Sequence, residues 1–243
     1  MATAPRRRPD SESPPNGRKG GANGDRMAGV PLVTIRRLYR YIRALELFQL
    51  EGQQSVSSEL LASTVGVKAS QLRKDLAYFG ELGTRGKGYA VDNLLAHLSE
   101  LLGLTREWPM VLVGVGNIGT ALSRYPGLAE RGFVLRALFD VNPKVVGTNI
   151  RGIPVHHLDR LTEICQAEGV AIAILTVPAE EAQGVADRLV AAGVRAILNV
   201  APVNLQVPSR VAVRNVDIAV ELRLLSYMLL AEGAAQPVAS RKH

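Results

Sequence analysis

The pattern of apolar residues divides the chain into two parts with different periods. Between residues 30 and 103, apolar side chains recur every three or four positions, which is the period of an amphipathic helix. Glycines that favour helix ends interrupt this pattern, and the glycine-rich segment 81–89 has the composition of a hairpin. The pattern predicts four helices, at 31–51, 58–65, 69–79 and 91–103.

From Pro109 onward, short apolar runs alternate with amphipathic segments, as expected of a parallel sheet whose strands are connected by helices. The strands are predicted at 109–113, 133–139, 153–155, 171–176, 195–200 and 211–215, and the helices at 117–125, 158–168 and 179–192. A last helix is predicted at 217–232. It is apolar over most of its circumference, so it needs an apolar groove to bury it. The alternative is a helix packed on its own domain.

These elements predict an α/β protein in five parts. Residues 1–28 are rich in Pro, Gly, Ser, Asn and Arg, so they lack the apolar surface that folding needs and are expected to be disordered. Three helices followed by a glycine-rich hairpin describe a winged helix-turn-helix domain, at 29–106. The alternating segment, 107–216, predicts a Rossmann-like doubly wound parallel sheet. The helix 217–232 and a flexible tail, 233–243, follow it.

Composition narrows the class of protein further. The 243 residues carry a formal net charge of +7, but the basic excess is spread along the chain and does not by itself indicate a nucleic-acid partner. Cys165 is the single cysteine, which excludes a disulfide within the chain. No apolar run approaches the roughly 20 residues of a membrane span, and the N-terminus lacks the apolar core of a signal peptide. We therefore expect a cytoplasmic protein without a membrane partner.

A glycine turn carries the clearest chemistry in the sequence. It follows the apolar run that ends at Val113, opens a predicted helix and consists of Gly114, Val115, Gly116, Asn117, Ile118 and Gly119. Gly114 permits a tight turn, Gly116 lets the backbone approach a pyrophosphate, and Gly119 lets helix and strand pack closely. Asp140 ends the next strand, where its carboxylate would accept hydrogen bonds from an adenosine ribose and repel a 2′-phosphate. The sequence thus favours NAD+ or NADH over the phosphorylated forms; the alternative for Asp140 is a turn residue.

The residues needed to turn a dinucleotide over are missing from the sequence. The four histidines lie in a helix, at the end of a short strand and at the C-terminus: His97, His156, His157 and His243. No Tyr-x-x-x-Lys pair occurs, no cluster of ligands suggests a metal, and too few residues follow the last strand for a substrate domain. We therefore expect a protein that binds a dinucleotide and is not an enzyme.

The third predicted helix, 69–79, has the features of a DNA recognition helix. Leu72, Leu76 and Phe79 share one face and are expected to face the core. Other side chains can reach base edges or phosphates, on this helix, in the hairpin and on the first helix. They are Ser70, Gln71, Arg73, Lys74, Tyr78, Arg85, Lys87 and Arg37. The alternative is a solvated basic face on a domain that binds proteins.

Six segments give the chain a resemblance to the Rex family of redox-sensing transcriptional repressors. They are 71–80, 83–89, 114–119, 139–140, 175–178 and 198–202, in the family's order. The resemblance implies a homodimer that binds operator DNA when free or with NAD+ and releases it when NADH binds. It also implies that the helix 217–232 is exchanged between subunits. Thr176, Val177, Pro178 and Asn199 fall in the matching segments and are expected to contact the cofactor.

The resemblance further implies a switch made of a tyrosine, an aspartate and an arginine, which match Tyr125, Asp217 and Arg43. Where the family often has a phenylalanine after the aspartate, near the nicotinamide, this chain has Ile218, so ring stacking is not expected there. Two other classes stay open: an NAD-dependent oxidoreductase with an atypical site, and a regulator that binds another nucleotide or CoA.

Overall fold

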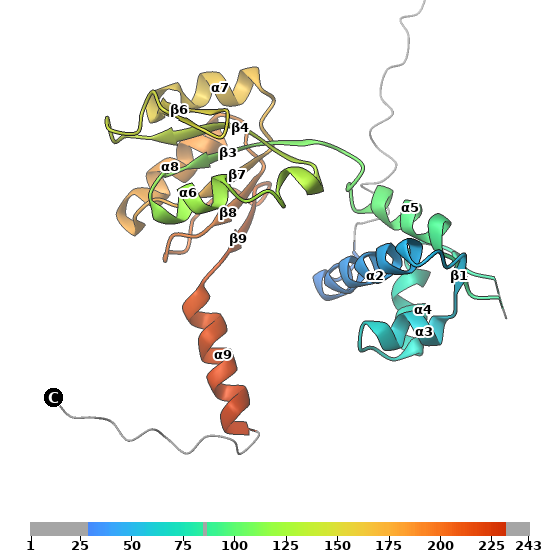
Figure 1. Ribbon diagram of the computed structural model, residues 1–243. Coiled ribbons are helices and arrows are strands. Elements are labelled where there is room, and N and C mark those ends of the chain that lie inside the picture. Colours follow the sequence, from blue (N-terminus) through green and yellow to red (C-terminus); the bar gives the residue numbers. More distant parts are fainter. Residues whose placement is uncertain (1–28, 85–86, 232–243) are drawn as a thin grey trace, which may run out of the picture. The chain divides into compact units, whose positions relative to one another are not determined.

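The structure is a computed structural model that describes residues 29–84 and 87–231. The chain divides into two compact units, Met1–Leu104 and Thr105–His243 (Figure 1). The expected disordered tail at 1–28, the flexible tail at 233–243 and Arg85 lie outside the described residues.

The described part of the first unit is a helical domain with a small antiparallel sheet. Its elements are α2 (Leu32–Leu50), β1 (Ser55–Val56), α3 (Ser58–Thr64), α4 (Ala69–Ala77), β2 (Tyr89–Ala90) and α5 (Val91–Leu101). Ser57 caps α3 by accepting a hydrogen bond from the Leu60 N–H. β1 pairs with β2, and a bridge between Thr84 and Gly88 forms the predicted hairpin beside them. Four helices of the sequence pattern are thus present.

One apolar core holds this unit together. It is built from the repeating positions of the helices, and its fully buried side chains include Leu38, Leu45, Leu61, Leu72 and Leu98. Each lies on the apolar face that the helical period predicts, since residues three or four apart share a helix face.

The second unit is a seven-stranded sheet with helices on both faces. Its strands are β3 (Trp108–Val113), β4 (Phe133–Asp140), β5 (Asn149–Ile150), β6 (Ile153–His157), β7 (Ile172–Leu175), β8 (Ala196–Asn199) and β9 (Ala212–Asn215). Its helices are α6 (Asn117–Ser123), α7 (Leu161–Ala167), α8 (Ala179–Ala191) and α9 (Ile218–Ala231), with 3₁₀ turns at Ala129–Arg131 and Leu158–Arg160. The strand order is β5-β6-β4-β3-β7-β8-β9, and all pairs are parallel except β5 with β6. Apart from the edge strand β5, this is the doubly wound order predicted from the sequence.

Side chains alternate between the two faces of the sheet. Val111 and Val113 of β3 join the core under α7 and α8, whereas Met110 and Leu112 join a smaller core that includes Leu122 of α6. Strands buried on both faces explain the continuous apolar runs in the sequence.

The sequence pattern missed β5 and misjudged some helix ends. β5 has two residues and turns into β6 through Arg151 and Gly152, which both have positive φ. Two residues are too few to show a period of two, so no alternation marks this strand. The helix predicted at 158–168 begins as a 3₁₀ turn, and the one predicted at 117–125 ends at Ser123.

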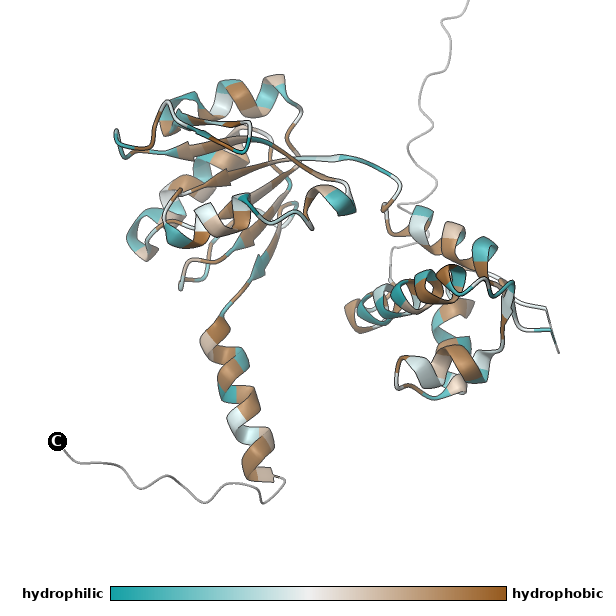
Figure 2. Cartoon of the chain, in the orientation of Figure 1, coloured by the Kyte–Doolittle hydropathy of each residue, from teal (hydrophilic) through white to brown (hydrophobic). Residues whose placement is uncertain are grey.

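α9 lacks a covering partner within the described chain. None of its residues is buried, and its large apolar side chains are all at least 45% exposed. Figure 2 shows apolar colour over most of this helix, interrupted by polar residues. Packing on its own domain, the alternative open from the sequence, is therefore not what this structure shows for α9.

Candidate functional site

The glycine turn lies where the strand order of the sheet reverses. From β3 the chain continues to β4 on one side, and it later returns to β7 on the other side of β3. In open α/β sheets, ligands bind beyond the carboxyl ends of the strands at such a point. Gly114–Gly119 follows β3 and Thr176–Pro178 follows β7, so both predicted segments reach this edge.

The three glycines of the turn have different surroundings. Gly114 has φ +98°, and an added Cβ would lie 2.6 Å from the Thr176 carbonyl oxygen. A Cβ on Gly119 would overlap the Gly114 carbonyl oxygen. Gly116 is exposed, and its added Cβ would meet no atom within 4 Å. Gly114 and Gly119 are therefore required by packing, while Gly116 borders open space that a ligand can enter.

Two polar side chains hold the glycine turn in place. The Thr176 hydroxyl lies 2.7 Å from the Gly114 carbonyl oxygen and 3.1 Å from that of Val113. The Asp140 carboxylate accepts hydrogen bonds from the Val115 N–H at 2.6 Å and from the Asn142 N–H at 2.8 Å. Asp140 therefore is a turn residue and, in addition, joins the end of β4 to the glycine turn.

The other predicted cofactor residues have different environments. Asn117, Ile118, Tyr125 and Pro178 are exposed, and Val177 is half-buried. Asn199 is fully buried, and its amide bonds the Ala201 and Val203 carbonyls and the Asn215 side chain. This asparagine ties the ends of β8 and β9 together, so its observed contacts are structural.

The predicted switch residues lie on both units. Arg43 is exposed on α2, and Tyr125 is exposed just after α6. The Asp217 carboxylate accepts hydrogen bonds from the Ala219 and Val220 N–H groups at 2.9 and 3.2 Å. Asp217 thus caps the first turn of α9 in this structure.

The helix α4, predicted to be the recognition helix, presents the residues that the sequence assigned to its two faces. Leu72, Leu76 and Phe79 are buried. Ser70, Arg73, Lys74 and Tyr78 are exposed. Gln71 is half-buried, and its amide nitrogen donates to Asp75 at 2.8 Å.

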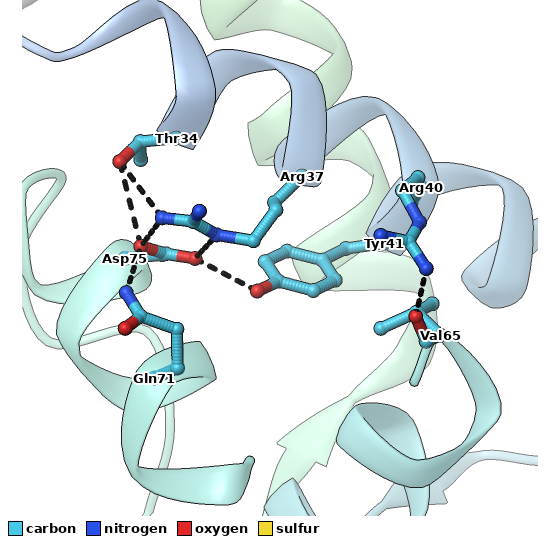
Figure 3. Close-up of polar contacts among 7 residues, drawn as sticks. All are labelled: Thr34, Arg37, Arg40, Tyr41, Val65, Gln71 and Asp75. Atoms are coloured by element: carbon cyan, nitrogen blue, oxygen red, sulfur yellow. Dashed lines mark hydrogen bonds and ion pairs between the residues drawn. The ribbon is translucent and has the colours of Figure 1, made fainter. Parts of the chain in front are cut away.

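Arg37 has a different environment from the one expected of a DNA contact. Its guanidinium forms a bidentate ion pair with Asp75, in which Nε and Nη2 lie 2.6 and 2.7 Å from the two carboxylate oxygens (Figure 3). Hydrogen bonding to this carboxylate raises the pKa of Arg37. The charge of Arg37 is therefore directed inward, toward α4. The sequence contains one signal for this pairing: Asp75 lies on the otherwise apolar face of α4, where an acid needs a partner.

A groove of about 890 Å³ lies between α3, the C-terminal end of α4 and the wing. Its lining includes Glu59, Arg73 and Lys87. Arg73 crosses it to contact the Glu59 carboxylate at 3.0 Å and the Ser58 hydroxyl at 2.7 Å. Ser58 and Glu59 carry no signal of this contact in the sequence, because only the turn before α4 brings α3 beside it.

Two other kinds of chemistry find little support in the described residues. Cys165 is buried in the core, and burial raises the pKa of its thiol to about 11, so the thiolate that redox chemistry needs is scarce near neutral pH. Over residues 29–84 and 87–231, no group of three or more His, Cys, Asp or Glu side chains is placed to hold a metal ion. None of the helices in this described part of the chain could span a membrane.

Comparisons with known proteins match both units. The family model described as "Putative DNA-binding protein N-terminus" matches residues 29–77, and the one described as "CoA binding domain" matches residues 105–203. A protein of Streptomyces coelicolor, named redox-sensing transcriptional repressor Rex, is 48% identical over 225 residues, covering 89% of this chain and 87% of its own. A protein of the same name from Desulfitobacterium hafniense is 48% identical over 198 residues, covering 82% of this chain and 94% of its own.

Solved structures of similar fold extend over both units. A crystal structure of RSP in complex with β-NAD+ and operator DNA has 38% sequence identity and a TM-score of 0.81, covering 84% of this chain and 94% of that one. A crystal structure of RSP in complex with β-NADH has 36% identity and a TM-score of 0.76, covering 85% and 97% of the two chains.

Proposed function

This chain belongs to the Rex family of redox-sensing transcriptional repressors, and on that basis we propose how it responds to the cell's redox state. It binds operator DNA when free or occupied by NAD+, and it releases the DNA when NADH replaces NAD+. The observation that carries this proposal is that RSP, which shares both units with this chain, was solved with β-NAD+ and operator DNA and also with β-NADH.

The dinucleotide site is the glycine turn at the reversal of the strand order. Gly116 leaves space for the pyrophosphate, and Asp140 lies at the end of the neighbouring strand, where a ribose hydroxyl can donate to it. Asn117, Ile118, Tyr125 and the Thr176–Pro178 segment border this edge. The dinucleotide is a ligand and not a substrate, because the relatives of this chain are named as repressors.

The DNA site is the exposed face of α4 together with the wing. Lys74 and Tyr78 lie on that face, and Lys87 extends it into the wing. Arg85, which the sequence also predicted as a DNA contact, lies outside the described residues. Arg73 reaches a base once it leaves Glu59, and this costs little, because water screens an ion pair that is exposed on both sides.

The functional unit is a homodimer in which α9 packs against the second copy. The apolar surface of α9 supports this proposal, because it is exposed in the single chain and too large for a monomer to leave in water.

Asp217 is the centre of the proposed switch. It hydrogen-bonds Tyr125 when NAD+ is bound, and it pairs with Arg43 when NADH is bound. The trigger is the loss of the positive charge of the nicotinamide ring on reduction. In the single chain the Asp217 carboxylate caps α9. Tyr125 or Arg43 must therefore compete with the N–H groups of α9 for this carboxylate.

One binding assay tests the proposal. Operator affinity is measured on a palindromic duplex, with NAD+, NADH, NADP+ and NADPH added separately. NADH alone should weaken binding strongly, and NAD+ should leave it intact or strengthen it. Equal effects of all four dinucleotides would contradict the proposal.

A second candidate ligand follows from the match to the CoA-binding family model, which covers the whole glycine turn. CoA and acetyl-CoA are therefore added as further arms of the same assay. Release of the operator by CoA, with no response to NADH, would replace the redox function with sensing of CoA.

A further inference from the structure

The carboxylate of Asp75 is the polar centre of the DNA-binding unit. The residue is 1% exposed, on the face of α4 that otherwise buries Leu72 and Leu76. It accepts hydrogen bonds from Arg37 Nε and Nη2, at 2.6 and 2.7 Å, from the Tyr41 hydroxyl at 2.8 Å and from Gln71 Nε2 at 2.8 Å. Figure 3 shows these donors converging on it from α2 and from α4 itself.

The surroundings of Asp75 keep it ionised. Burial alone would raise the pKa of its carboxyl group, but the hydrogen bonds from Arg37, Tyr41 and Gln71 outweigh burial and lower the pKa. An ionised carboxylate can only accept hydrogen bonds. Each side chain that touches Asp75 must therefore present a donor.

This requirement fixes the orientation of the Gln71 amide. If the amide were flipped, its oxygen would face the carboxylate and be repelled, so the nitrogen has to face Asp75. Figure 3 shows the amide nitrogen toward Asp75 and the amide oxygen turned away from it. One N–H of the amide is used by Asp75, which leaves the oxygen and the second N–H for another partner.

Gln71 lies next to residues that the proposed function places on the DNA. It directly follows the exposed Ser70, and the exposed Lys74 lies three residues later, on the neighbouring turn of α4. An amide that offers one donor and one acceptor matches the major-groove edge of adenine, which presents N7 as an acceptor and N6–H as a donor. Guanine presents two acceptors there, so a fixed outward oxygen disfavours it.

We propose that Gln71 reads an adenine in each half of the operator and that Asp75 is the positioning residue that holds its amide in the reading orientation. The inference rests on the proposed function, because it requires α4 to enter the major groove. It adds to that function the identity of one base in each half of the operator, adenine, and the residue that makes Gln71 select it, Asp75.

The test compares base preference and not affinity alone. A palindromic duplex is selected by the full-length protein from a randomised DNA pool, and each base pair of a half-site is then replaced in turn. For the wild type, adenine at one position should bind roughly 10- to 100-fold more tightly than guanine, the range of one paired base contact. Gln71→Ala should abolish the preference at that position and leave the preferences at the others.

Asp75→Asn separates positioning from simple folding. The substituted side chain keeps the shape and can still accept from Arg37, but its own amide N–H₂ allows the Gln71 amide to turn over. The adenine preference at that one position should fall at least tenfold, and the double variant Gln71→Ala/Asp75→Asn should behave like Gln71→Ala. Tyr41→Phe is the matched control: it removes another donor from the same carboxylate and should leave base preference unchanged.

Three results would overturn the inference. They are an unchanged preference in Asp75→Asn, an equal loss of preference at every position, or a further change when Asp75→Asn is added to Gln71→Ala. If Asp75→Asn does not fold, Gln71→Glu decides. A glutamate cannot donate to Asp75 and is repelled by it, so its carboxylate turns outward, and the preference should move from adenine toward cytosine, whose N4–H₂ is a donor. Unchanged adenine preference in Gln71→Glu would also overturn it. A wild type that selects no duplex from the pool contradicts the proposed function instead.

Discussion

Gly116 and Gly119 are three residues apart and meet different constraints. Gly119 lacks room for a Cβ because the Gly114 carbonyl lies against it, whereas Gly116 has open space around it. The constraint on Gly119 comes from the protein itself, whereas the open space at Gly116 fits a ligand that fills it. A motif in the sequence does not separate the two roles, but the structure does.

We predict that Gly116→Val abolishes the response to NADH and leaves a folded protein that still binds the operator. The added side chain meets no protein atom at its Cβ, so it costs the fold little, but it occupies the space expected for the pyrophosphate. Thermal unfolding and operator affinity with and without NADH are the measurements. Gly119→Ala is the contrasting variant, and it should lower the melting temperature. Release by NADH in Gly116→Val would place the ligand elsewhere.

Asp140 is predicted to contribute to both cofactor choice and turn geometry. Asp140→Ala should reduce the ratio of NADH to NADPH affinity, because the charge that repels a 2′-phosphate is removed. It should also weaken binding of both, since the Val115 N–H loses its acceptor. Calorimetric titration with each dinucleotide gives the two values. An unchanged ratio would leave Asp140 with the turn role alone.

Among the helices, the contact between α2 and α4 gives Arg37 a structural role, because it places the guanidinium against the Asp75 carboxylate. We predict that Arg37→Ala lowers the free energy of unfolding by about 3–5 kcal/mol, because it leaves the buried Asp75 carboxylate short of its cation. Chemical denaturation measures this loss. The dependence of operator affinity on salt should stay unchanged, because a residue that does not touch phosphate releases no counterion. A smaller salt slope with unchanged stability would restore the DNA contact expected from the sequence.

The exposed face of α4 is predicted to supply operator affinity. Arg73→Ala should weaken binding by about 1–3 kcal/mol if Arg73 reads a guanine. The Glu59 and Ser58 contacts that it makes in the free protein are exposed and easily exchanged. Affinity is measured at several salt concentrations, with Arg136→Ala, on β4 of the other unit, as a matched control. Unchanged affinity in the double variant Arg73→Ala/Lys74→Ala would remove α4 from the interface.

In the molecule as a whole, α9 is the helix whose apolar side chains stay exposed in a single chain. We predict that Leu222→Asp/Leu229→Asp converts the proposed dimer into a monomer and weakens binding to a palindromic operator. Each leucine is more than half exposed in the single chain, and full burial of such a side chain contributes about 1.5–3 kcal/mol. Sedimentation analysis and operator titration test this. Arg223→Gln, on the same helix, should leave the dimer intact, and a dimeric double variant would exclude α9 from the interface.

Much of this protein is determined locally in the sequence. The helical period between residues 30 and 103, the apolar runs of the sheet and the glycine turn with its acid twenty-odd residues later are all short-range patterns. They predicted the α/β class, the doubly wound sheet and the recognition helix, because secondary structure and phosphate-binding turns depend on neighbours in the chain. β5 was missed because two residues carry no period.

Only the tertiary structure decided which side chains share a partner. Arg36 and Arg37 are adjacent and chemically identical, yet Arg36 is exposed and Arg37 pairs with a carboxylate 38 residues away. Asn199 fell in a segment expected at the cofactor, but its amide is used to join β8 and β9. Such contacts depend on how α2 crosses α4 and how two strands end together. A buried carboxylate or amide takes whatever donors the fold brings to it, and no local pattern records which those are.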